Sequence, residues 1–137
     1  MWYNVYWINK FGGDNTRIII NGYLKNITES EYTPINVNGI KTKNKISYIF
    51  NEERFILRLL SNKKIILERE TNQTKNAIYF EHSKRIPSVY TLKENDLDIN
   101  IDITTKFIEI TTNSIKIIYL VNESNNEYEY FIKYSLK

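Results

Sequence analysis

Apolar side chains recur at every second position in several parts of the chain. The alternation is found in residues 97–103, in residues 115–119 and near the carboxy terminus. Successive side chains of a β-strand point to opposite faces, so this spacing predicts strands with one face toward a core. The alternating apolar residues near the carboxy terminus are Tyr128, Tyr130, Ile132, Tyr134 and Leu136.

Shorter runs rich in β-branched and aromatic residues predict further strands. Turn-forming residues separate them at 51–53, 61–62, 113–114 and 123–126. Residues 52–60 also contain apolar residues at helical spacing, but the run is short and its apolar residues alternate too, so we predict a strand there. The runs are Arg17–Ile20, Ile35–Ile40, Lys45–Phe50, Arg54–Leu60, Lys64–Arg69, Ala77–Glu81 and Ser88–Leu92.

About eight to ten antiparallel strands must protect their edges, either by closing into a barrel or by packing as two sheets. The positions of the apolar residues within residues 96–112 favour a barrel over two packed sheets. The apolar phase runs on odd positions through Ile103 and reappears on even positions at Ile108 and Ile110. A β-bulge near Thr104–Phe107 would absorb this slip and bend a long strand, as a barrel wall requires, and a tight turn is the alternative. We therefore predict an all-β fold with a single antiparallel β-barrel.

Composition narrows the class of protein. The 137 residues fit one domain, and the chain has no cysteine, so disulfides, thiolate metal sites and a cysteine nucleophile are excluded. The net charge is +3, with 19 basic and 16 acidic residues well mixed. The sequence shows neither a signal peptide nor an apolar run long enough to span a membrane. We expect a cytoplasmic protein.

One acidic stretch has the spacing of a calcium-binding loop. Counted from Asp98, it reads D-x-N-x-D and reaches Glu109 at the twelfth position. The sixth position, which must turn sharply, is the β-branched Ile103. An extended strand also spaces its same-face carboxylates roughly 6.5–7 Å apart, too far apart to converge on one ion. We predict a solvated strand face and no metal site.

A set of residues in the chain matches positions of a known family: Arg69, Phe80, Tyr90-Thr91, Asn95–Ile99, Thr105–Ile108 and Ile115–Tyr119, with Gly39–Tyr48 and Arg54–Glu70 upstream. In these residues the chain resembles the YwiB-like family, small bacterial proteins with a domain of unknown function. The similarity covers residues 18–137, with residues 1–17 as an aromatic extension or first strand. Asn95 and residues around His82 stand where the family has glycine. The resemblance implies a calycin-like, lipocalin-like barrel and no established activity.

Arg69, Tyr90 and Tyr119 are the candidate ligand-binding residues. Arg69 has the parity of the apolar residues of its strand, and an inward guanidinium needs a carboxylate, carbonyls or an anionic ligand. Glu81 is the expected partner, although Arg69 could instead be a structural or rim residue. Tyr90 and Tyr119 match aromatic positions of the resemblance, and their hydroxyls would donate to a ligand or to backbone carbonyls.

No catalytic constellation is recognisable. His82 is the lone histidine, and no motif supplies it with a nucleophile. We expect neither an enzyme nor a cofactor. The densest basic spots, Lys41–Lys45 and Lys84-Arg85, would suit single-stranded nucleic acid on a barrel surface, but acidic residues flank most basic ones.

Met1–Phe11 is too aromatic to lie exposed, so we expect it to complete the sheet, to plug a barrel mouth or to make a homodimer contact. The leading hypothesis for the whole chain is a non-catalytic barrel that binds a small apolar or amphipathic ligand inside. The competing hypothesis is a structural or protein-interaction barrel filled by its own side chains. Nucleic-acid binding ranks third.

Overall fold

The computed structural model describes residues 15–137 and contains ten antiparallel strands closed into one barrel. Each strand pairs with its neighbours in chain order, and β1 pairs with β10 to close the barrel. The predicted antiparallel barrel is therefore confirmed. Residues 1–14, with nearly all of the predicted aromatic extension, lie outside the described residues. The strands are β1 (Thr16–Asn26), β2 (Glu31–Thr42), β3 (Lys45–Phe50), β4 (Glu53–Ser61), β5 (Lys64–Glu70), β6 (Thr74–Glu81), β7 (Lys84–Leu92), β8 (Leu97–Ile110), β9 (Ser114–Val121) and β10 (Asn126–Leu136).

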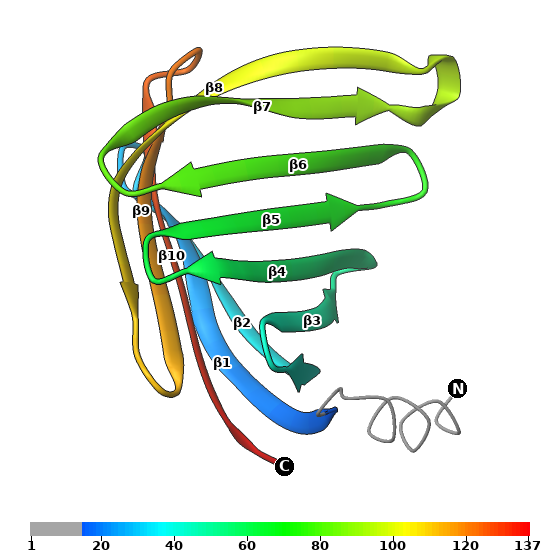
Figure 1. The fold of residues 1–137 in the computed structure, drawn as a ribbon. Coiled ribbons are helices and arrows are strands. Elements are labelled where there is room, and N and C mark those ends of the chain that lie inside the picture. Colours follow the sequence, from blue (N-terminus) through cyan, green and yellow to red (C-terminus); the bar gives the residue numbers. More distant parts are fainter. Residues whose placement is uncertain (1–14) are drawn as a thin grey trace.

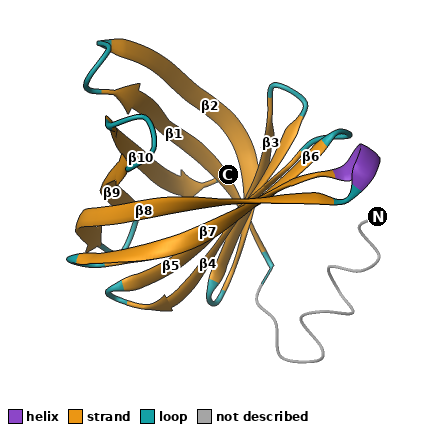
Figure 2. Ribbon diagram, turned by 90° about the horizontal axis from the view of Figure 1, so that it is seen from above, coloured by secondary structure: helices purple, strands orange, loops and turns teal. Residues whose placement is uncertain are grey.

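The strands form two groups that run across one another (Figure 1). Strands β4–β8 lie side by side in one group, while β1, β2, β9 and β10 make the other. Seen from above, the short helix η1 (Lys93–Asn95) lies at the outer end of the β7–β8 hairpin (Figure 2). No helix in the described part of the chain is long and apolar enough to cross a bilayer.

Tight turns carry the chain between neighbouring strands. The turn between β3 and β4 places both Asn51 and Glu52 at positive φ, the conformation that the commonest two-residue hairpin turns need. Residues 52–60, which also had helical spacing, form strand β4 as predicted. Before β8, the left-handed residue is Asp96, one position later than Asn95, the residue that stands at the family's glycine.

Strand β8 contains the bulge that the change of apolar phase predicted. Thr105 pairs with Tyr119 and Phe107 with Ile118, so Lys106 is the extra residue. Thr105 and Ile108 are buried, while Lys106 and Phe107 between them are exposed. This bulge lets one 14-residue strand keep its apolar face inward while it bends from one group of strands into the other.

The core fills the space between the two groups of strands. It is made mainly of aliphatic residues at alternating positions, as the period-2 pattern predicted, together with the aromatic residues Tyr48, Phe55, Phe80, Tyr119 and Tyr130. Gly22 lets β1 approach β10 closely, because a methyl group there would overlap the backbone carbonyl oxygen of Phe131. The most deeply buried core residues are Ile18, Ile20, Ile46, Leu57, Ile65, Ile115, Ile117 and Ile132.

The expectation that Leu97 and Ile99 face the interior is wrong. Their exposed fractions are 47% and 41%, and Asp98 and Asn100 are exposed as well. The start of β8 pairs with the end of β7 at one end of their hairpin, and both of its faces are exposed there. Inward packing begins at Ile101 and is complete at Ile103.

Acidic side chains of β8 interact with other residues of the same chain. The Asp98 side chain accepts a hydrogen bond from Thr91, and Asp102 forms an ion pair with Arg85 at 2.7 Å. Among residues 15–137, no three histidine or acidic side chains are grouped closely enough to hold a metal ion.

Candidate functional site

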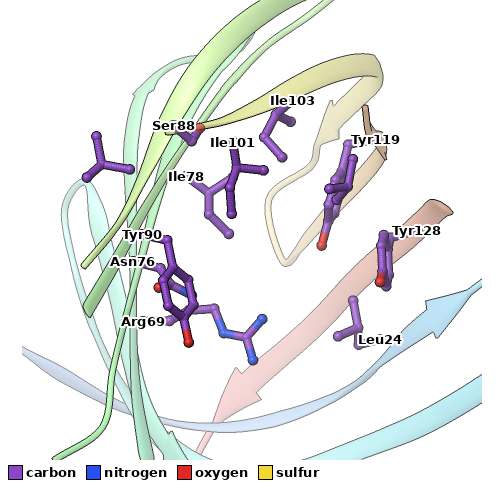
Figure 3. Close-up of a pocket in the computed structure, with 12 residues that line it drawn as sticks. Leu24, Arg69, Asn76, Ile78, Ser88, Tyr90, Ile101, Ile103, Tyr119 and Tyr128 are labelled. Atoms are coloured by element: carbon purple, nitrogen blue, oxygen red, sulfur yellow. The ribbon is translucent and has the colours of Figure 1, made fainter. Parts of the chain in front are cut away.

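A cavity of about 270 Å³ lies inside the barrel, between β6–β8 on one side and β1, β9 and β10 on the other (Figure 3). Its wall is mainly apolar, and the apolar residues come from five different strands. Such a wall forms because inward positions of neighbouring strands meet across the barrel. The apolar lining residues are Leu24, Ile78, Val89, Ile101, Ile103 and Val121.

Polar groups are also part of the lining. They include three candidate residues that the sequence singled out, since Arg69, Tyr90 and Tyr119 all contact this one cavity. A few polar groups in an otherwise apolar wall are typical of sites that bind and orient a small molecule. The polar lining residues are Arg69, Asn76, Ser88, Tyr90, Tyr119 and Tyr128.

Arg69 reaches the interior because β5 turns alternate residues inward. Ile65 and Leu67 are buried on the same face, and Figure 3 shows the guanidinium extending into the cavity. The Glu53 carboxylate accepts hydrogen bonds from Nε at 2.8 Å and from Nη2 at 3.0 Å. The guanidinium also lies 4.9 Å from the centre of the Phe55 ring. Burial opposes the positive charge, but the hydrogen bonds and charge of Glu53 outweigh it and raise the pKa of Arg69.

The expected pairing of Arg69 with Glu81 is wrong. Glu81 instead pairs with Lys84 at 2.8 Å and lies 3.9 Å from Lys64. It shares a face of β6 with the exposed Tyr79, whereas the buried Phe80 lies on the inner face. The register also separates the two residues, because Arg69 pairs with Asn76 near one end of the hairpin and Lys64 with Glu81 at the other.

A second cavity of about 170 Å³ adjoins the first and shares Leu24, Arg69 and Tyr119 with it. Glu53, Phe55 and Tyr130 contribute to its wall. Arg69 therefore lines both chambers of the interior, and its partner Glu53 lines the smaller one.

Several tyrosines place their hydroxyl groups in the interior. The hydroxyls of Tyr48 and Tyr130 bond to each other in the core. Tyr119 stacks on Tyr128, and within residues 15–137 the hydroxyls of Tyr90 and Tyr119 form no hydrogen bond. Burial raises the pKa of Tyr48, Tyr119 and Tyr130 above its usual range, so these hydroxyls stay protonated at neutral pH.

Asn76 connects Arg69 and Tyr90 in one row across three strands. It pairs with Arg69 on β5 and with Tyr90 on β7. Its Oδ1 atom is buried and has no hydrogen-bond partner, which is uncommon for a native side chain. This row gives one wall of the cavity a cation, a carboxamide and a hydroxyl next to one another.

Sequence reasoning did not identify Glu53, Asn76 or Tyr128 as site residues. A signal existed for Glu53, because it shares parity with the buried Phe55 and Leu57 and an inward arginine needs an inward acid. Asn76 could be found only from the register of β5 with β6, which side-chain alternation leaves open.

The remaining candidates lie away from the cavity lining. Nδ1 of His82 accepts a hydrogen bond from the Ile108 amide at 3.1 Å, next to the bulge of β8. Lys41–Lys45 spans the hairpin between β2 and β3, while Lys84 and Arg85 are paired with carboxylates. Nucleic-acid binding stays a prediction, and these two ion pairs reduce the unbalanced positive charge that would support it.

The fold is similar to that of a known protein. The crystal structure of the ywiB protein from Bacillus subtilis superimposes with a TM-score of 0.67, covering 91% of this chain and 93% of that one at 14% identity. No protein-family profile matches the sequence, and no curated protein matches it. The chain thus has a YwiB-like fold, as the resemblance predicted, and at this identity the likeness concerns the fold alone.

Proposed function

We propose that this YwiB-like barrel is a non-catalytic binding protein for a small apolar or amphipathic molecule. The observation that carries the proposal is the cavity of about 270 Å³, with an apolar wall and an arginine directed into it. Its volume is close to the lower end for small-molecule sites, so the ligand is small. A calycin-like classification of the barrel and a cytoplasmic location belong to the same proposal.

The position of Arg69 supports binding over mere packing. Taking a guanidinium out of water is costly, and an apolar side chain of similar size would fill the same space without that cost. Its side chain is 26% exposed, and Glu53 accepts from only two of its N–H groups. The remaining donors are available to a bound molecule.

The titratable groups of the cavity argue against catalysis. General acid–base chemistry at neutral pH needs a group whose pKa lies near that pH. The lining offers an arginine with a raised pKa and, in Tyr119, a tyrosine with a raised pKa, neither of which exchanges protons readily at neutral pH. His82, the lone histidine of the chain, bonds to the bulge of β8 and is not among the residues of this lining.

A fluorescent-probe titration tests the proposal. The neutral probe N-phenyl-1-naphthylamine should bind saturably, with one site per chain and enhanced emission. Ile101→Trp places a bulky ring at the cavity wall and should abolish the signal, whereas Ile99→Trp, on the same face of β8 but outside the lining, should keep it. If the folded protein takes up no probe, the barrel is filled by its own side chains and acts as a structural or interaction module.

A further inference from the structure

Resting on the proposed binding function, we infer that the polar end of the ligand is an uncharged group, a hydroxyl or an amide, and not a carboxylate or a phosphate. Glu53 determines this preference, because it neutralises the charge of Arg69 before any ligand arrives.

The charges of the two chambers balance without a ligand. Arg69 is the only charged side chain among the residues that line the larger chamber, and the smaller chamber adds Glu53 alone. The two side chains form a bidentate ion pair at 2.8 and 3.0 Å, the geometry in which a carboxylate matches a guanidinium most closely. The described lining of this interior therefore carries no net charge.

A ligand carboxylate would disturb that balance. It would leave water for a partly buried site and find the guanidinium already shared with Glu53, so the interior would acquire a net negative charge. An uncharged acceptor loses much less hydration and still receives a hydrogen bond from a cationic donor, which is stronger than one from a neutral donor. The same arginine thus favours a neutral head group as long as Glu53 accompanies it.

The neighbouring polar groups fit a head that both donates and accepts. The hydroxyls of Tyr90 and Tyr119 contact the cavity without partners in the described structure. Asn76 Oδ1, next to Arg69 across the β5–β6 ladder, lacks a donor. A hydroxyl or amide can accept from Arg69 and donate to a nearby oxygen, whereas an ionised carboxylate or a simple ester cannot donate.

Displacement of N-phenyl-1-naphthylamine by octan-1-ol, octanamide and octanoate at pH 7.5 tests the inference, because the three share one chain length. The wild-type protein should release the probe at concentrations of octanol or octanamide at least tenfold lower than of octanoate. Glu53→Gln should raise the affinity for octanoate at least tenfold and reverse the order. Glu68→Gln is the matched control: it changes charge equally on the adjacent outer face of β5, where Glu68 pairs with Arg58, and should leave the order unchanged.

If Glu53→Gln alone does not fold, the double variant Glu53→Gln/Arg69→Met is measured in its place. It restores an uncharged interior and should again favour octanol. Octanoate displacing the probe from the wild type as readily as octanol overturns the inference, while the probe signal itself still supports the binding function. Absence of probe binding overturns the binding function first, so the two failures are distinguishable.

Discussion

Replacing Glu53 by glutamine should destabilise the protein through an unpaired charge. Glutamine keeps the shape of the side chain but offers Arg69 one neutral acceptor in place of two carboxylate oxygens. Breaking a fully buried ion pair costs roughly 3–5 kcal/mol, and a hydrogen bond to a charged group contributes roughly 1.5–3 kcal/mol. The side chains of Arg69 and Glu53 are 26% and 19% exposed, so water partly compensates the loss. We therefore expect the free energy of unfolding to fall by about 2–3 kcal/mol.

A double-mutant cycle separates the lost charge balance from lost packing. Arg69→Met leaves Glu53 without its cation and should cost about as much as Glu53→Gln, whereas the double variant contains neither charge and should cost only about 1 kcal/mol. Urea denaturation followed by circular dichroism measures all four proteins, with unchanged m-values as the check that the unfolded states are comparable.

The control pair, Arg58 and Glu68, joins the same two strands, β4 and β5, on their outer face. Arg58 and Glu68 interact at 3.1 Å with side chains 43% and 30% exposed, so Glu68→Gln should change the free energy of unfolding by about 0.5 kcal/mol or less. Additive effects of Glu53→Gln and Arg69→Met, or a Glu68→Gln cost equal to that of Glu53→Gln, would refute the reasoning.

Three further changes test other parts of the structure. His82→Ala removes the acceptor of the Ile108 amide and should speed hydrogen exchange at that amide and cost about 1 kcal/mol; unchanged exchange contradicts this. Gly22→Ala should lower the free energy of unfolding in urea denaturation by about 3 kcal/mol, since its methyl group would overlap the β10 backbone, and a neutral effect contradicts that close approach. The Glu70 carboxylate accepts hydrogen bonds from Lys93 and Arg54. These bonds, the one from Lys93 most of all, lower the pKa of Glu70 from 4.5 to about 2. Its contribution to stability is therefore full above pH 4.5 and is lost as the pH falls toward 2, so Glu70→Gln should flatten the acid-induced fall in stability across that interval, and an unchanged pH profile contradicts the assignment.

The period-2 pattern was sufficient to predict most of the architecture. It gave nearly every strand, and the phase slip between Ile103 and Ile108 located the bulge of β8 within two residues of Lys106. These features are local, because alternation along a strand fixes which of its residues share a face. The inward position of Arg69 followed from the same reasoning.

The two wrong predictions, the inward position of Leu97 and Ile99 and the pairing of Arg69 with Glu81, both depended on how other strands pack. The apolar pattern at Leu97 and Ile99 is the same as at Ile103, but no strand packs over the start of β8, so these side chains remain exposed. Parity within β6 did not show which of its faces is internal, and Glu81 proved to be external.

The sequence by itself thus determined that the chain forms alternating strands, that the apolar phase slips within the longest of them, and that Arg69 shares a face of its strand with apolar residues. Only the tertiary structure decided which carboxylate accompanies its guanidinium, how long each strand stays covered, and that Arg69, Asn76 and Tyr90 share one cavity wall. The reason is that alternation fixes the face of a side chain, whereas register and closure fix its neighbours, and these depend on how all ten strands fit together around the barrel.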